Sequence, residues 1–225
     1  MILLFDLDGT VLTFDDGPKG PGRAALDLAM RELHGRDDAT SGVRLAGGTD
    51  RALARALLRV AGAGDDPAAI DLLLATYLRH LEAVLTTRRY RPIGDVAGTV
   101  AACRARGACV AVATGNVREG ARIKLASARL DPVFDLERGG YGCDAEPRED
   151  VLRAAVARCA AHGDPARVVV IGDTEHDVRA ARAIGARVVG VAVRPEAREE
   201  LAAAGADAIV DRCGEPLVAA IFAVA

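Results

Sequence analysis

The sequence predicts an α/β fold in which an open parallel sheet carries helices on both faces and a helical segment follows the first strand. Short, β-branched apolar runs alternate with helical patterns along most of the chain, which is typical of doubly wound sheets. Residues 17–90 break the alternation because they hold helical patterns and no convincing strand. Ligands of open α/β sheets bind at the carboxyl ends of the strands, so we expect the functional site there.

Four apolar runs have the composition expected of buried parallel strands. They are ILLF (2–5), CVAVAT (109–114), RVVVIG (167–172) and ARVVGVAV (186–193), with AIV (208–210) as a candidate fifth. The helical patterns between and after them span about residues 94–106, 117–130, 148–162, 175–184, 196–204 and 215–223. Together these elements predict one α/β core domain, built from residues 1–16 and 91–225.

The inserted segment contains three stretches with helical patterning, at residues 20–35, 50–62 and 66–85. Glycine and proline mark both of its ends, in GPKGPG and in YRPIG, which is typical of hinges and helix boundaries. We therefore predict a separate helical domain over residues 17–90.

The composition narrows the class of partner. The chain has 225 residues, 27% of them charged, and a formal net charge of −3, which gives no general attraction to nucleic acid or acidic membranes. No apolar run approaches the roughly 18 residues that cross a bilayer, and no signal-peptide pattern stands out, so we expect a cytoplasmic protein. The five cysteines lack CxxC spacing, which favours reduced thiols over disulfides or a zinc site.

Polar residues of a few particular kinds follow three of the predicted strands. They are Asp6 and Asp8, Thr114 and Asn116, and Asp173 and Asp177. Each one alone suits a turn or a helix cap, but parallel neighbouring strands would bring all of them to one sheet edge. Carboxylates from two strands favour a hard divalent cation, and Mg²⁺ is the usual one beside a phosphate. A bound cation would also offset the repulsion between Asp6 and Asp8, which an extended chain presents on one face.

Three motifs in this order resemble those of the haloacid dehalogenase-like (HAD) phosphohydrolase superfamily. They are DLDGT at 6–10, ATGN at 113–116 and IGDTEHD at 171–177. The insertion after the first motif looks like the C1-type helical cap of phosphoglycolate-phosphatase-like members. The resemblance implies a Rossmann-like core and a Mg²⁺-dependent phosphatase of small phosphate monoesters. Its partner would be a small phosphorylated metabolite such as phosphoglycolate, a sugar phosphate or a nucleotide, and the chain would be a monomer or a dimer.

Carried over position by position, the resemblance implies roles for the acidic residues. Asp6 would attack phosphorus and form an aspartyl-phosphate, and Asp8 would act first as general acid and then as general base. The carboxylates of Asp6 and Asp173 and the backbone carbonyl of Asp8 would bind Mg²⁺, with Asp177 in support.

The phosphate would be bound mainly by the second motif. Thr114 would donate a hydrogen bond to a phosphoryl oxygen, and backbone N–H groups at the start of the following helix would assist, since anions are favoured at helix N-termini. We therefore assign Gly115 and Asn116 to phosphate or substrate binding, together with Gly9 of the first motif.

The sequence departs from the superfamily pattern at one catalytic position. A lysine usually precedes the third-motif strand, but GCDAEPREDVLRAA at 142–155 contains none, and the chain has only Lys19 and Lys124. Lys124 lies about eight residues into the helix after Thr114. At about 1.5 Å per residue we expect it on the order of 12 Å from the sheet edge, which is out of reach.

Arg148 is the replacement that we favour. It lies near the start of the helix that leads into the third-motif strand, which is the end that would meet Asp6 and the phosphate. An arginine keeps the positive charge and can bind a phosphate with two N–H groups, although it is not equivalent to lysine. The alternative is a surface residue that pairs with Glu149 or Asp150.

The inserted helices would select the substrate. AGGTDRALARALL at 46–58 resembles a stretch in the caps of phosphoglycolate-phosphatase-like enzymes, and it places Gly48, Thr49 and Arg51 near a helix start. Arg51 would then bind a second anionic group of the substrate. A helix capped by Thr49 or Asp50 explains the same residues equally well.

Other activities of the superfamily fit less well. A haloacid dehalogenase generally lacks the acid found here at Asp8, and a phosphonatase would need a Schiff-base lysine in its cap. A phosphomutase of the β-phosphoglucomutase type shares Asp6 and Asp8 and stays open as an alternative. A catalytically weak binding or regulatory protein is a second alternative, because the usual lysine is missing.

Overall fold

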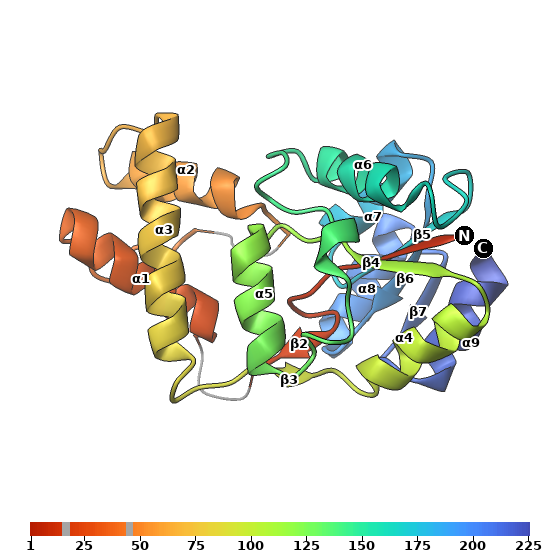
Figure 1. Ribbon diagram of the computed structural model, residues 1–225. Coiled ribbons are helices and arrows are strands. Elements are labelled where there is room, and N and C mark those ends of the chain that lie inside the picture. The colour runs from red at the N-terminus through yellow and green to blue at the C-terminus, as the bar shows by residue number, and fades with distance from the viewer. Residues whose placement is uncertain (15–18, 44–46) are drawn as a thin grey trace.

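The computed structural model describes residues 1–14, 19–43 and 47–225 (Figure 1). Its main sheet has five parallel strands in the order β4-β1-β5-β6-β7. These strands are β1 (Ile2–Phe5), β4 (Cys109–Val112), β5 (Val168–Gly172), β6 (Arg187–Val191) and β7 (Ala208–Val210). The parallel sheet confirms the predicted fold class, and β7 confirms the candidate fifth strand.

Helices cover both faces of this sheet, as the prediction of a doubly wound fold requires. The side chains of β1 alternate, so that Leu3 and Phe5 pack into one apolar cluster and Ile2 and Leu4 pack into another. The first cluster includes residues of α4 (Val96–Ala105), α5 (Arg118–Ser127) and α9 (Glu215–Val224). The second includes residues of α6 (Arg148–Cys159), α7 (Glu175–Ala183) and α8 (Pro195–Ala204).

The inserted segment contains helices α1 (Pro21–His34), α2 (Asp50–Val60) and α3 (Pro67–Val84), whose apolar side chains form a third cluster. We call these three helices the helical cluster. Figure 1 shows them on one side of the molecule, with α5 between them and the sheet. α5 packs in both directions, because Ile123 joins the helical cluster and Leu125 joins the core beside the sheet.

A two-stranded sheet lies where the chain leaves and re-enters the core. It pairs β2 (Leu12–Thr13) antiparallel with β3 (Arg91–Pro92), and the sequence did not indicate it. A short 3-10 helix, η1 (Leu136–Arg138), lies between α5 and α6 along the chain. The division into domains of 1–16 with 91–225 and of 17–90 stays a prediction, and residues 15–18 at its first boundary lie outside the described residues. None of the described helices is long and apolar enough to cross a membrane.

Candidate active site

A cavity of about 530 Å³ lies at the carboxyl ends of β1, β4 and β5, with residues of the helical cluster on its other side. The residues predicted from sequence that line it are Asp6, Asp8, Gly9, Thr114, Gly115, Asn116, Arg148 and Asp173. Asp177 accepts a hydrogen bond from Arg148, which itself lines the cavity. The sheet therefore brings all three motifs together at the edge where the sequence placed them.

Three carboxylates gather at the carboxyl ends of β1 and β5 and at the start of α7 (Glu175–Ala183). Asp6 directly follows β1, and its backbone N–H donates to the Ile171 carbonyl at 2.9 Å, which keeps the chain extended beside β5. Asp173 follows β5, and Asp177 lies in the first turn of α7, where it forms a capping box with Thr174. Carboxylate oxygens of Asp6, Asp173 and Asp177 all lie within 4.8 Å of one another. Such a set of oxygen donors could bind a metal ion.

Arg148 is the cation among these carboxylates. It is the first residue of α6, and its Nη2 lies 2.7 Å from Asp6 Oδ1 and 2.6 Å from Asp177 Oδ1. The alternative of a surface residue paired with a neighbour is wrong, because the Arg148 side chain is buried and Asp150 pairs with Arg153 instead. The structure thus places Arg148 where the missing lysine led us to expect it, and its role stays a prediction.

The electrostatics of this cluster are unbalanced. Burial raises the pKa of Asp6 to about 6, against the opposing charge of Arg148. Burial and the neighbouring Asp177 and Asp6 carboxylates raise the pKa of Asp173 well above its usual range. Burial disfavours the charged form of Arg148, but Asp177 and Asp6 outweigh it and raise the pKa of the guanidinium. The folded chain therefore gathers more negative charge here than one guanidinium can neutralise.

The second motif is hydrogen-bonded to Asp8. The Asn116 side-chain amide donates to Thr114 Oγ1 and to Asp8 Oδ2, each at 2.8 Å. The Thr114 backbone N–H donates to the Gly140 carbonyl at 3.0 Å, which continues the pattern of β4 beyond the strand. Asp8 and Thr114 are thereby fixed relative to each other by one side chain.

Two glycines allow close approach at the cavity. Gly9 has φ +84°, and a Cβ there would lie 2.1 Å from Asp173 Oδ2. A Cβ at Gly115 would lie 2.1 Å from the Gly48 carbonyl oxygen, which belongs to the loop before α2. Both positions therefore require glycine, the first also because of its left-handed backbone.

Lys124 corrects the prediction from sequence. We expected it to be out of reach, but its Nζ lies 2.7 Å from Asp8 Oδ2 and it lines the cavity. The reason is the direction of α5, which runs between the sheet and the helical cluster rather than away from the site (Figure 1). The second turn of α5 consequently still faces the cavity. The other lysine, Lys19, pairs with Asp27 and Asp38.

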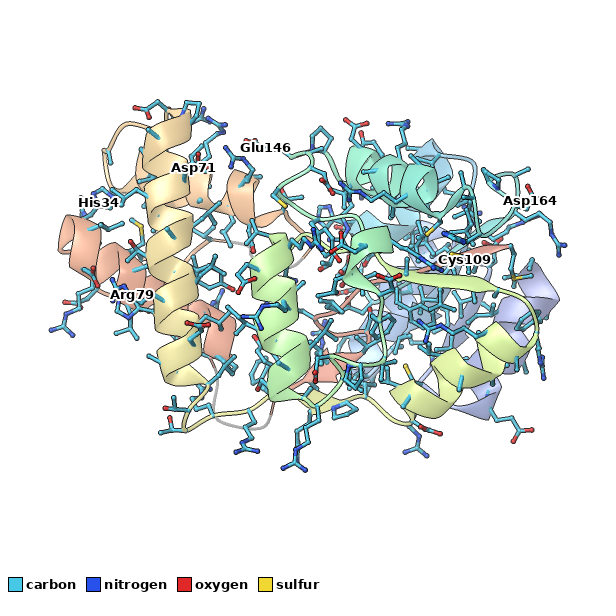
Figure 2. The ribbon with its side chains drawn as sticks, viewed as in Figure 1. His34, Asp71, Arg79, Cys109, Glu146 and Asp164 are labelled. Atoms are coloured by element: carbon cyan, nitrogen blue, oxygen red, sulfur yellow. The ribbon has the colours of Figure 1, made fainter. Side chains whose placement is uncertain are left out.

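Arg51 is the second correction. Its Nη1 pairs with Asp71 Oδ1 of α3 at 2.6 Å, and it does not line the cavity formed by the described residues. Figure 2 shows Asp71 on the helical cluster, away from the sheet. Thr49 is the N-cap of α2 and accepts from the Ala52 N–H, as the alternative interpretation predicted. Successive residues of a helix point about 100° apart, so Arg51 turns to α3 while Asp50 faces the cavity.

Asp50 joins the helical cluster to the second motif. Its backbone N–H donates to the Gly115 carbonyl at 2.7 Å, and its Oδ2 accepts from the Val117 N–H at 2.8 Å. Burial raises the pKa of Asp50 to about 6, although Lys124 acts in the opposite direction. The sequence indicated Asp50 only as a helix cap, because nothing in a single sequence shows which side of a helix start contacts the loop after β4.

Other cavity residues were not indicated by the sequence at all. They come from the helical cluster and its connections, and they are Phe14, Arg23, Leu26, Leu53, Tyr77 and Tyr90. Tyr77 and Tyr90 are buried, and in the sequence such aromatic residues look the same as ordinary packing residues.

Comparison with known proteins identifies the family. A family model described as haloacid dehalogenase-like hydrolase matches residues 1–185. The chain belongs to this family. The match confirms the resemblance drawn from the three motifs and shows that the protein is an enzyme of the hydrolase class.

Curated relatives and solved structures agree with this membership. A phosphoglycolate phosphatase of Caulobacter vibrioides is 30% identical over 198 residues, covering 84% of this chain and 76% of that protein. Pyrophosphatase PpaX of Anoxybacillus flavithermus is 24% identical, covering 96% of this chain and 94% of that protein. The crystal structure of CbbY from Rhodobacter sphaeroides in complex with xylulose-(1,5)bisphosphate has a TM-score of 0.72 at 21% identity, over 94% of this chain and 93% of that one. The structural likeness shows that this HAD hydrolase shares their fold.

Proposed function

We propose that this protein is a Mg²⁺-dependent phosphatase that hydrolyses small phosphate monoesters. The observation that carries the proposal is the buried group of Asp6, Asp173, Asp177 and Arg148 at one end of the cavity, with Asp8 beside it. A cavity of about 530 Å³ suits a small substrate. The name of the Caulobacter vibrioides relative supports the same class, because phosphoglycolate is a small phosphate monoester, and the name of the Anoxybacillus flavithermus relative supports a small phosphate-containing substrate, because pyrophosphate is a phosphoanhydride.

The residues present fit a Mg²⁺ ion. Three carboxylates share one guanidinium, and the raised pKa of Asp173 reflects the excess of negative charge in a buried place. A hard divalent cation bound by oxygen ligands would offset that excess. The carboxylates of Asp6 and Asp173 and the backbone carbonyl of Asp8 would hold it, with Asp177 in support. When bound, the ion would keep Asp6 ionised and neutralise charge on the phosphoryl group.

In the proposed reaction, a carboxylate oxygen of Asp6 attacks phosphorus and forms an aspartyl-phosphate while Asp8 gives a proton to the leaving oxygen. Asp8 then takes a proton from the water that hydrolyses this intermediate. The contact of Arg148 with Asp6 Oδ1 fixes the orientation of the nucleophile. The Nε of Arg148 is buried and has no partner among the described residues, which leaves one donor of this guanidinium unsatisfied.

Thr114 supports the same assignment. Its hydroxyl oxygen already accepts a hydrogen bond from the Asn116 amide, so its own hydrogen is available to a phosphoryl oxygen. Gly9, Gly115 and Asn116 would complete the binding site for the phosphate and its leaving group. The helical cluster would belong to a cap domain formed by residues 17–90, which would exclude bulk water and admit substrate.

The test is phosphate release from a panel of small phosphate monoesters, measured with Mg²⁺ and with EDTA, for the native chain and for Asp6→Asn. We expect release that needs the metal and that disappears in Asp6→Asn. A phosphomutase would instead show little release and would require a bisphosphate activator. Release that is equal in the native chain and in Asp6→Asn would contradict the proposal.

A further inference from the structure

Lys124 is a buried lysine whose ammonium faces the substrate space. The residue is 5% exposed, yet it lines the cavity. A buried ammonium is costly unless it is paired, and this one contacts Asp8 Oδ2 at 2.7 Å and lies 5.5 Å from the centre of the Tyr90 ring. The contact with the Asp8 carboxylate supplies that pairing, so the geometry suits an ammonium at this position.

The place of Lys124 distinguishes it from Arg148. Arg148 contacts Asp6, the residue that attacks phosphorus in the proposed function, whereas Lys124 contacts Asp8, the residue that protonates the leaving oxygen. The two cations consequently mark the two ends of the reacting bond. Arg148 lies on the side of the phosphoryl group, and Lys124 lies on the side of the leaving group.

The surroundings of Lys124 favour an anion. A Cβ at Gly22 would lie 3.6 Å from the Lys124 Nζ, so the ammonium adjoins the first turn of α1. That helix start has no side-chain cap at Gly20 and no acidic residue in its first turn, and Gly20, Gly22 and Arg23 line the cavity. Its N–H groups are partly used, since Pro21 has none and the Gly22 N–H donates to the Tyr90 hydroxyl at 3.2 Å. Helix N-termini favour negative charge. Asp50 also lies in this wall and carries negative charge when ionised, but its Oδ2 is directed to the Val117 N–H.

We propose that Lys124 determines specificity by binding a second anionic group, a carboxylate or a phosphate, that the leaving group carries within a few atoms of the reacting oxygen. This inference rests on the proposed function and adds the class of leaving group to it. Asp8 does not lose its anchor when Lys124 turns to the substrate, because Asn116 also donates to Asp8 Oδ2 at 2.8 Å.

The test compares 2-phosphoglycolate with ethyl phosphate, which differ by a carboxylate in place of a methyl group. We expect the native enzyme to prefer 2-phosphoglycolate in kcat/KM, and we expect Lys124→Met to reduce the ratio of the two values by roughly 10- to 100-fold, mainly through KM. Lys19→Met is the matched control, because Lys19 pairs with Asp27 and Asp38 rather than with a cavity residue. It should keep the native ratio. Lys124→Gln, which retains a hydrogen-bond donor, serves if Lys124→Met does not fold.

Binding separates this inference from the proposed function. In the Asp6→Asn background, calorimetry measures the dissociation constants of the same two compounds without turnover. Preferential binding of 2-phosphoglycolate that disappears with Lys124→Met would support the inference even if the native chain released no phosphate, a result that would contradict only the proposed function. Equal binding of both compounds, or a ratio unchanged by Lys124→Met, would overturn the inference.

Discussion

The two walls of the cavity differ in how their residues reach it. On the sheet wall, Asp6, Thr114 and Asp173 each follow a buried parallel strand. Neighbouring strands in register therefore fix the positions of these residues. On the helical wall, Asp50 and Tyr77 come from helices α2 and α3, and packing between helices decides which side of each helix meets the cavity.

This difference has a chemical counterpart. The sheet wall holds the groups proposed to act on the phosphoryl group, and these have little freedom because they are buried and bonded to one another. The helical wall, together with Lys124 of α5, holds the groups that would meet the leaving group. A change in the sheet wall should therefore affect every substrate, whereas a change in the helical wall should affect the choice among substrates or the seating of the cap.

Arg148→Met tests the sheet wall and should have the largest effect. It leaves three buried carboxylates without their cation, so we expect kcat/KM to fall by about 10²- to 10³-fold for all substrates. Arg148→Lys should restore part of the loss because it returns the charge without the planar guanidinium and its separate Nε donor. Steady-state kinetics on at least two substrates measure both variants. A loss confined to one substrate would place Arg148 with the selective groups and remove the contrast between the walls.

Gly115→Ala tests the contact between the loop before α2 and the second motif, where the two walls meet. The new methyl group would lie 2.1 Å from the Gly48 carbonyl oxygen, so the loop before α2 must move and the Asp50 to Gly115 hydrogen bond must weaken. We expect a loss of about 1–3 kcal/mol in the free energy of unfolding, together with a higher KM. Chemical denaturation and kinetics measure the two quantities.

Gly64→Ala provides the control for that substitution. The nearest atom to a Cβ at Gly64 is Asp66 Oδ2 at 3.7 Å, an ordinary contact. It should change neither stability nor KM appreciably. If Gly115→Ala behaved in the same way, the helical cluster would not be seated on the second motif in solution.

Asp50→Asn tests the buried carboxylate of the helical wall. Because the folded environment raises the pKa of Asp50 from 3.8 to about 6, its contribution favours folding below pH 4 and is lost as the pH rises through 6. Asparagine can still accept from the Val117 N–H and carries no charge. We expect the variant to gain about 1–3 kcal/mol of stability over the native chain at pH 8 and almost none near pH 4. Denaturation at a series of pH values measures the difference.

The exposed Asp37 supplies the comparison for that experiment. Asp37→Asn removes a carboxylate from an exposed position and should change the free energy of unfolding by less than about 0.5 kcal/mol at pH 8. An Asp50→Asn curve parallel to the native one would mean that Asp50 is solvated, and that the helical cluster does not cover the cavity as the structure has it.

The same contrast explains what the sequence could predict. The ends of the strands follow from short apolar runs, so the fold class is confirmed and Asp6, Asp8 and Asp173 lie at the predicted edge of the sheet, while their roles stay predictions. The prediction placed Lys124 too far away because it took distance along a helix as distance from the site. The direction of α5 in fact comes from its packing against the core beside the sheet and against the helical cluster. Arg51 was misplaced for a similar reason, since one residue of rotation separates the face toward the cavity from the face toward α3.

The ion pair between Arg55 and Glu146 should give the smallest effect, and it sharpens the comparison by asking what holds the two walls together. Arg55 of α2 bonds Glu146 in the loop before α6, with Nη2 to Oε1 at 2.7 Å, and both side chains are about one third exposed. Figure 2 shows Glu146 where the helical cluster meets the core. Exposed pairs of this kind contribute little and are screened by salt. Arg55 also donates to the Asp65 carbonyl at 2.9 Å, so Glu146→Gln isolates the pair better than Arg55→Met does. Glu146→Gln should lower the melting temperature by on the order of 1 °C at low salt, and it should cause no further loss when Arg55→Met is already present. A larger loss that persists at high salt would mean that this pair, and not the contact of Asp50 with the second motif, holds the helical cluster closed over the cavity.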